Sequence, residues 1–146
     1  IQVMGEVKPN VPGVIVLAGE SGFAGRMDHV FAQFDALVKA QSLWKGMRIV
    51  MFHADAISFM LFPGANTIRA AQANRGRWCA LIPVVPCRSV STTGLRWNLS
   101  KAKMKMGGLV SSSNEAVADT VEVETSDPLL FVCGLPGRLA LNREEV

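Results

Sequence analysis

Thr120-Val121-Glu122-Val123-Glu124-Thr125 alternates apolar and polar side chains with a period of two. This alternation is typical of a strand that packs one face on a core and turns the other to water, so we expect the valines inside and the glutamates outside. Glu122 and Glu124 are the only acidic pair at i, i+2 in the chain, and a solvated strand face explains them better than a metal site does. The segment therefore predicts a half-buried antiparallel strand.

Further short strand candidates surround this segment from residue 63 onward. Gly, Pro and Asn residues separate them, and little helical periodicity is found among them, which is typical of an antiparallel sandwich or barrel. The candidates are 66–73, 78–84, 89–95, 103–107, 109–113, 120–125 and 129–133. We predict an antiparallel β-sandwich over residues 63–146, with a weakly ordered tail from residue 134.

The residues before Pro63 follow a different pattern. A β-branched run at 14–18 leads into a glycine-rich turn, and strand-like runs follow at 48–53 and 57–62. Between them, apolar residues recur at helical spacing: Val30, Phe31, Phe34, Leu37 and Val38. The predicted fold class is therefore α+β, with a partial α/β layer of strand, Gly-rich turn, helix and strand over residues 1–62, followed by the antiparallel β-sandwich.

The composition excludes several classes of function. The 146 residues are 49% hydrophobic, which is ample for a core, and the 18% charged residues carry a net charge of only +3. Because no dense Lys/Arg stripe is present, we expect no nucleic-acid partner. Lys101, Lys103 and Lys105 are spaced to lie on one side of a strand, where a solvated face is favoured over a phosphate-binding patch.

The cysteines and the hydropathy pattern bear on the cellular setting. Cys79, Cys87 and Cys133 are odd in number and form no C-x-x-C pair, so neither a disulfide framework nor a zinc site is predicted. No apolar run approaches the length needed to span a bilayer, and the first residues do not follow a signal-peptide pattern. We therefore expect a reduced, cytoplasmic protein without a membrane partner.

One segment joins an aromatic ring to amide and hydroxyl groups. It reads Thr92-Thr93-Gly94-Leu95-Arg96-Trp97-Asn98-Leu99 and is followed by Gly108-Leu109-Val110-Ser111-Ser112-Ser113-Asn114. Such groups suit a flat, polar heteroaromatic ligand, which needs a surface for stacking and a few fixed hydrogen-bond partners. Taken alone, however, a tryptophan such as Trp97 is more often a half-buried core residue, and the alternative interpretation of the Ser111 to Asn114 stretch is a polar turn after a strand.

A second segment, Gly22-Phe23-Ala24-Gly25-Arg26-Met27-Asp28-His29, stands at the expected start of the helix. Backbone N–H groups at a helix N-terminus bind anions, and Arg26 adds a charge that can hold phosphate oxygens. Asp28 either stabilises the helix end, by about 0.3–1 kcal/mol, or acts in a site. His29 and His53 show no metal-ligand spacing and are interpreted as structural or surface residues.

Together these segments resemble the thiamine pyrophosphokinases over about residues 14–131. That family has a G-G-R-x-D-H/Q turn that opens a helix, a T-G-L-K/R-W-N-L segment, and a G-x-L-V-S-x-S-N segment before a closing V-x-V-E-T-x-x-P-L-L strand pair. The resemblance implies an enzyme that transfers diphosphate from ATP to the hydroxyl of thiamine and releases AMP.

The resemblance also implies roles for individual residues. It assigns Asp28 and Arg26 to catalysis, Gly22, Gly25, Arg26 and Asp28 to nucleotide and phosphate binding, and Trp97, Asn98, Ser111 and Asn114 to thiamine binding. It further implies a homodimer with shared active sites, because the β-domain of one subunit holds thiamine opposite the nucleotide half of the other. Two departures are Glu115-Ala116, where several relatives have an aromatic residue, and Asp55-Ala56, where relatives have an acidic-Ser pair.

The family needs Mg²⁺, which it holds with aspartates upstream of the glycine-arginine turn. Glu6 is the only acidic residue before the first expected strand, so we expect no metal ligands in this chain and a fragment that lacks the Mg-binding acidic loop. One alternative is a non-catalytic module for thiamine binding and dimerisation. Another is a β-sandwich interaction domain with Trp97 in its core, for which Trp97→Ala would cost roughly 3–5 kcal/mol of stability.

Overall fold

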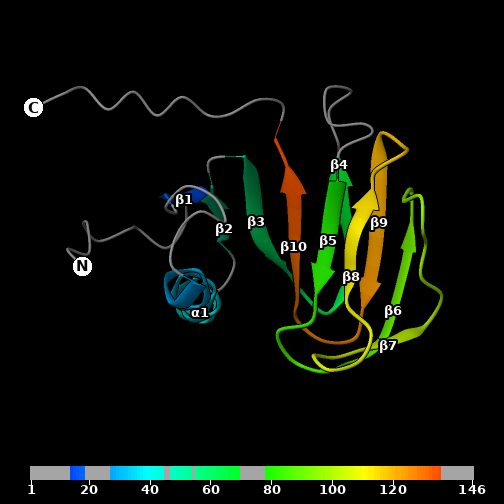
Figure 1. Cartoon of the computed structure of the whole chain (residues 1–146), viewed down its shortest axis with the longest axis horizontal. Helices are drawn as coiled ribbons and strands as arrows, with labels where there is room; N and C mark the ends of the chain where they lie inside the picture. The colour runs from blue at the N-terminus through cyan, green and yellow to red at the C-terminus, as the bar shows by residue number, and fades with distance from the viewer. Residues whose placement is uncertain (1–13, 19–26, 45–46, 54, 70–77, 136–146) are drawn as a thin grey trace, which may run out of the picture.

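The computed structural model of the chain describes residues 14–18, 27–44, 47–53, 55–69 and 78–135. Within these ranges the chain forms one helix and ten strands, which confirms the predicted α+β class (Figure 1). The helix is α1 (Met27–Leu43). The strands are β1 (Val14–Ala18), β2 (Arg48–Phe52), β3 (Ala56–Leu61), β4 (Gly64–Arg69), β5 (Trp78–Ile82), β6 (Cys87–Thr93), β7 (Ala102–Met104), β8 (Ser111–Glu115), β9 (Thr120–Thr125) and β10 (Leu129–Gly134).

The described strands form two sheets. The first sheet has the order β1-β2-β3-β10-β5-β8, and the second has the order β4-β9-β6-β7. β1 and β2 run parallel, with α1 between them in the chain, while the remaining described pairs are antiparallel. Because β3 pairs with both β2 and β10, the N-terminal strands and the later β-rich region share one continuous sheet.

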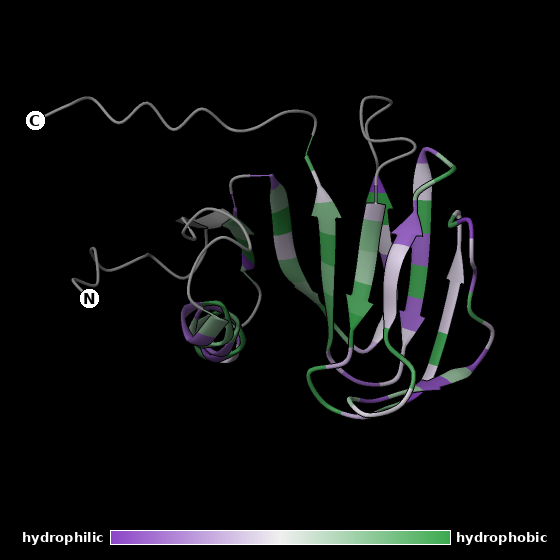
Figure 2. Cartoon of the chain, viewed as in Figure 1, coloured by the Kyte–Doolittle hydropathy of each residue, from purple (hydrophilic) through white to green (hydrophobic). Residues whose placement is uncertain are grey.

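Strand β10 occupies the middle of the first sheet and is buried on both faces. Leu129 and Phe131 belong to a core cluster that also contains residues of the second sheet. Leu130 and Val132 belong to a different cluster, with residues of α1 and β2. The first sheet therefore lies between α1 and the second sheet. Burial on both sides explains why β10 is a continuous apolar run, visible in Figure 2, rather than an alternating one.

The alternation predicted for β9 is confirmed. Val121 and Val123 are 1% and 0% exposed and pack in the core between the two sheets. Glu122 is half-buried and Glu124 is exposed on the opposite face of the strand. Figure 2 shows the same alternation along the strand. The interpretation of these two glutamates as a solvated face therefore agrees with the structure.

The apolar stripe predicted for the helix is only partly correct. Leu37 is fully buried, but Phe31 is 62% exposed, whereas Ala40 and Gln41 are buried. The reason is that the buried residues of α1 all lie in its second half, and the helix contacts β2 and β3. Gln41 tolerates burial because its side-chain amide donates a hydrogen bond of 2.8 Å to the carbonyl of Met47.

The bounds of strands β7 and β8 also differ from the prediction. The strand expected at 109–113 begins at Ser111 and ends at Glu115, so the stretch interpreted as a polar turn is itself strand β8. The strand expected at 103–107 is the short β7, because Gly107 adopts a positive φ of 75° in the turn that follows. The predicted residues 70–73 and most of the predicted tail lie outside the described residues.

The one helix that the structure describes is too short and too polar to cross a membrane.

Candidate functional site

The predicted thiamine-binding residues gather around a turn after β6. We call residues 94–99 the Trp97 turn. Gly94 opens it with a φ of 81°, and a Cβ atom there would lie 2.3 Å from the backbone oxygen of Thr120, so only glycine fits. The Gly94 carbonyl accepts hydrogen bonds from the backbone N–H groups of Val117 and Ala118, at 2.9 and 3.3 Å. The turn is therefore pressed against the connection between β8 and β9.

Asn98 shapes this turn from within. Its Oδ1 accepts hydrogen bonds from the backbone N–H of Leu95 and from the Thr92 hydroxyl, at 3.1 and 3.3 Å. The same Thr92 hydroxyl accepts the N–H of Leu99 at 2.8 Å. Asn98 thus holds the turn closed around Trp97.

Asn114 reaches the same turn from β8, and only 3% of it is exposed. Its Oδ1 accepts the backbone N–H groups of Trp97 and Glu115, at 3.2 and 2.8 Å. Its Nδ2 donates to the Trp97 carbonyl at 2.8 Å and to the Ser111 hydroxyl at 3.3 Å. A side-chain amide has two donor and two acceptor positions, so all four positions of Asn114 are occupied within the protein. Asn114 therefore fixes the backbone on both sides of Trp97.

Trp97 itself projects outward. It is 58% exposed, so the interpretation of Trp97 as a core residue is wrong. The Arg96 guanidinium lies over the indole, with Cζ 5.7 Å from the ring centroid, within the range of a cation–π interaction. Arg96 also pairs with Glu115, with Nε 2.9 Å from Oε2 and Nη2 3.2 Å from Oε1. The site thus presents an aromatic ring beside a bidentate ion pair.

The resemblance predicts Trp97, Asn98, Ser111 and Asn114 as one group, and the structure brings these four together. The prediction missed Arg96 and Glu115 as members of the same cluster. One signal was available, since Glu115 was recognised as a departure from the family pattern. Nothing in the sequence showed that it lies opposite Arg96, because 19 positions separate the two residues.

The predicted phosphate-binding residues cannot be placed in the same way. Gly22, Gly25 and Arg26 lie outside the described residues. Asp28 lies in the first turn of α1, where its side chain is exposed. The roles of these four residues in phosphate binding and catalysis remain predictions.

His53 has a structural environment, in agreement with its interpretation as a structural residue. Its Nε2 shares a hydrogen bond of 2.9 Å with the hydroxyl of Ser58, which is fully buried. The ring also makes an edge contact with Phe34, at a centroid distance of 6.3 Å. Burial lowers the pKa of His53, and the nearby Asp55 carboxylate partly opposes this shift. The imidazole is therefore neutral at pH 7.

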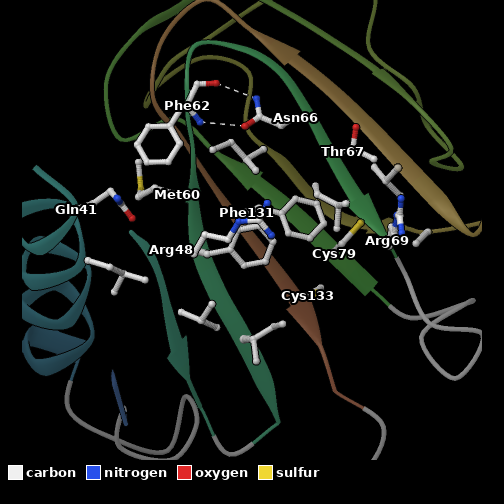
Figure 3. A pocket seen from close by; sticks show the side chains of 18 of the residues that line it. Gln41, Arg48, Met60, Phe62, Asn66, Thr67, Arg69, Cys79, Phe131 and Cys133 are labelled. Carbon is white, nitrogen blue, oxygen red and sulfur yellow. Dashed lines mark hydrogen bonds between the residues drawn. The ribbon is translucent and has the colours of Figure 1, made fainter. Parts of the chain in front are cut away.

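A large hollow among the described residues lies away from Trp97. It is an open groove of about 900 Å³, lined by residues of β2, β3, β4, β5 and β10 (Figure 3). At its rim, the Asn66 side chain holds both backbone groups of Phe62, at 3.2 and 2.8 Å. Its lining includes Phe131 and two thiols, Cys79 and Cys133. None of the predicted thiamine-binding residues lines this groove.

Cys79 and Cys133 are directly opposite each other on β5 and β10. Burial raises the pKa of each thiol to about 11, and in Cys79 the neighbouring Cys133 and Glu115 add to the shift. Both thiols are therefore protonated at neutral pH.

Across the described part of the chain, no three His, Cys, Asp or Glu side chains gather as metal ligands do. The described His, Cys, Asp and Glu side chains therefore do not fit a Mg²⁺ site.

Comparison with known proteins connects this site to a family. Residues 65–130 match the family model described as thiamin pyrophosphokinase, vitamin B1 binding domain. Thiamine pyrophosphokinase 2 of Oryza sativa subsp. japonica is 36% identical over 124 residues, which cover 83% of this chain and 44% of the rice protein. Thiamine pyrophosphokinase 1 of Arabidopsis thaliana is 30% identical over 126 residues, covering 84% of this chain and 45% of the relative. The chain thus spans less than half the length of these relatives.

Solved structures share the fold. Thiamin pyrophosphokinase from Candida albicans superposes with a TM-score of 0.76 at 23% identity, covering 91% of this chain and 48% of the other. The thiamine pyrophosphokinase from Bacillus subtilis gives a TM-score of 0.70 at 21% identity, covering 84% and 55%. At this level of identity the structures support the fold, while the sequence matches carry the relationship. Over the region it shares with these relatives, the chain is therefore similar to the thiamine pyrophosphokinases, and its residues 65–130 match the model of their vitamin B1 binding domain.

Proposed function

We propose that this chain is the thiamine-binding part of a thiamine pyrophosphokinase, the enzyme that transfers diphosphate from ATP to the thiamine hydroxyl and releases AMP. The observation that carries the proposal is the outward-facing Trp97 indole, whose backbone is held on both sides by the buried amide of Asn114. An exposed aromatic ring on a rigid turn is a stacking surface for a flat heteroaromatic ligand.

The residues around Trp97 take different roles in this proposal. Trp97 stacks on the ligand, and Ser111, which is half-buried, offers its hydroxyl to the polar edge of the pyrimidine. Asn98 and Asn114 act as positioning residues, because their side-chain atoms already hold the turn. This refines the prediction from the resemblance, which assigned all four residues to thiamine contacts.

We also propose the division of the chain that the sequence indicated. Residues 1–62 form part of an α/β nucleotide-binding layer, supported by the parallel β1–β2 pair with α1 between them. Residues 63–146 form a β-sandwich, supported by the core cluster shared between β5, β10 and the second sheet. In this division the phosphate-binding residues and the thiamine-binding residues belong to different parts.

The nucleotide side of the proposal rests on the resemblance. Gly22, Gly25, Arg26 and Asp28 would bind the phosphates of ATP, with Arg26 and Asp28 acting in catalysis. Mg²⁺ would neutralise phosphate charge during the transfer. Its ligands are expected outside this chain, and a homodimer would bring the thiamine side of one subunit to the nucleotide side of the other.

The test is AMP release by the full-length protein supplied with ATP, Mg²⁺ and thiamine. We expect AMP to form only when thiamine is present, and Trp97→Ala to raise the thiamine KM at least tenfold. Trp78→Ala is the matched control, because Trp78 is also exposed, at 41%, but lies at the start of β5 outside the Trp97 turn. A full-length protein that binds thiamine without releasing AMP would support the non-catalytic module instead.

A further inference from the structure

The Arg96–Glu115 ion pair is built into the Trp97 turn by its backbone as well as by its side chains. The backbone N–H of Arg96 donates to the Glu115 carbonyl at 2.9 Å, and the next residues along, Leu95 and Ala116, form an isolated β-bridge. Because the two backbones are paired, the two side chains start from adjacent positions. The bidentate geometry therefore costs less side-chain entropy than an ion pair between independent loops.

This ion pair determines the charge next to the exposed ring. The Arg96 guanidinium lies over the indole and would repel a second positive group that approaches the same ring. The Glu115 carboxylate, with 25% of its side chain exposed, compensates that charge at 2.9 Å. The pair as a whole is neutral, so it adds no net charge beside the exposed part of the ring that a cationic ligand would approach.

Thiamine is such a ligand, because its thiazolium ring carries a permanent positive charge. We propose that the Arg96–Glu115 pair sets the charge selectivity of the Trp97 surface, with Glu115 as the specificity-determining residue that admits a positively charged ring. The inference rests on the proposed function, since it concerns the same surface. It goes beyond that function by assigning a role to a residue at which this chain departs from the family pattern.

The experiment compares two ligands of similar aromatic shape and different charge, cationic thiamine and neutral thiochrome. Dissociation constants are measured by equilibrium dialysis on the full-length protein, and the readout is the ratio of the thiochrome constant to the thiamine constant. Three variants are needed: Glu115→Gln, Arg96→Gln and the double variant. Each keeps a planar polar side chain, and urea unfolding verifies that each remains folded.

The two single variants are expected to move this ratio in opposite directions. Glu115→Gln leaves the Arg96 charge uncompensated and lowers the ratio by roughly threefold to tenfold, the size expected for one charge near a cationic ligand in a solvent-exposed setting. Arg96→Gln leaves a free carboxylate and raises the ratio by a similar factor. The double variant is again neutral and returns the ratio to within about twofold of wild type.

A purely structural role for the ion pair predicts a different pattern. Both single variants would then weaken both ligands in parallel, and a ratio that stays constant or moves in the same direction in both would overturn the inference. Glu122→Gln is the matched control, because Glu122 is also a strand glutamate with a side-chain partner, the Thr67 hydroxyl at 2.8 Å, but lies on the second sheet. Its ratio should equal that of wild type. If the wild-type protein bound neither compound, the proposed function itself would fail, and the inference with it.

Discussion

Two turns of this molecule have similar glycine conformations and very different surroundings. Gly94 in the Trp97 turn has a φ of 81°, and Gly107 in the connection from β7 to β8 has a φ of 75°. A Cβ atom on Gly94 would meet the Thr120 backbone oxygen at 2.3 Å, whereas a Cβ on Gly107 would find nothing within 4 Å. The Gly107 turn, residues 105–109, is closed by its own backbone through Lys105, Gly108 and Leu109.

The Trp97 turn is held mainly by residues that are distant in sequence, among them Asn114, Glu115 and Val117. The backbone hydrogen bonds of the Gly107 turn join residues of the turn itself, so they fix its shape but do not tie it to another strand. A turn bonded to another strand keeps both its shape and its place. The comparison teaches that the Trp97 turn is built to hold a side chain at a fixed point on the surface, while the Gly107 turn only reverses the chain.

The largest expected effect separates these two glycines. Gly94→Ala should lower the free energy of unfolding by more than about 3 kcal/mol, because it adds a backbone clash to the positive φ. Gly107→Ala meets only the conformational penalty and should cost about 1 kcal/mol. Urea unfolding of both variants measures the difference. Equal losses of stability would remove the distinction between the two turns.

Asn114→Ala tests the long-range hydrogen bonds that hold the Trp97 turn. The change leaves the Trp97 N–H and carbonyl without their partner, and we expect a loss of about 2 kcal/mol in chemical denaturation. Asn66→Ala is the matched control, since Asn66 holds the backbone of Phe62 in the same way, but Phe62 is exposed, so water replaces the two lost bonds. Its cost should stay below about 1 kcal/mol. A larger cost for Asn66→Ala would contradict the importance given to the buried amide.

Alkaline pH tests the sheet behind the Trp97 turn, because Cys79 is the register partner of Asn114 across β5 and β8. Burial raises the pKa of both Cys79 and Cys133 to about 11 from the ordinary value of 9.0. The unfolded thiols lose their protons first, so the stability contributed by the protonated thiols is present below pH 9 and is lost as the pH rises through 11. Thermal unfolding midpoints at pH 8, 9, 10 and 11 should fall progressively. In the variant Cys79→Ala/Cys133→Ala this part of the decline should disappear, and an unchanged decline would assign it to other groups.

Trp97→Ala should have the smallest effect on stability. With 58% of the residue exposed, the lost burial is small, and the free energy of unfolding should stay within about 1 kcal/mol of wild type. Thiamine affinity, measured on the same preparation, should fall sharply. A stability loss of about 3–5 kcal/mol with no selective loss of thiamine binding would show that Trp97 is a core residue, and it would contradict the proposal that the Trp97 turn holds a ligand-binding side chain at the surface.

The parts of the fold that follow from local pattern were predictable. The alternation in β9 places Val121 and Val123 inside because a strand has only two faces, and the structure agrees. The exposure of Phe31 was not predictable, because the helical spacing shows which residues share a face but not how far along that face the sheet extends.

The same limit applies to the site. The sequence indicated Trp97, Asn98, Ser111 and Asn114 as one group, and the structure brings them together. It could not show that the Asn114 amide has no position left for a ligand, nor that Thr120 crowds Gly94, because both facts depend on chain segments brought together only by folding. Residue types predict which chemistry is available, whereas tertiary contacts decide which atoms remain free to use it.

The position of β10 in the first sheet has a consequence for the exchange of backbone amides with deuterium. β10 is hydrogen-bonded to β3 on one side and to β5 on the other, and its side chains are buried on both faces, so its amides should exchange only when the whole sheet opens. β8, which carries Asn114, is the last described strand on one edge of the sheet and can open without disturbing that centre. A ligand at Trp97 should therefore slow exchange in β10 by its full binding free energy, because global opening releases the ligand, and in β8 only as far as local opening disturbs the Trp97 turn, so that local and global opening are read separately in one experiment.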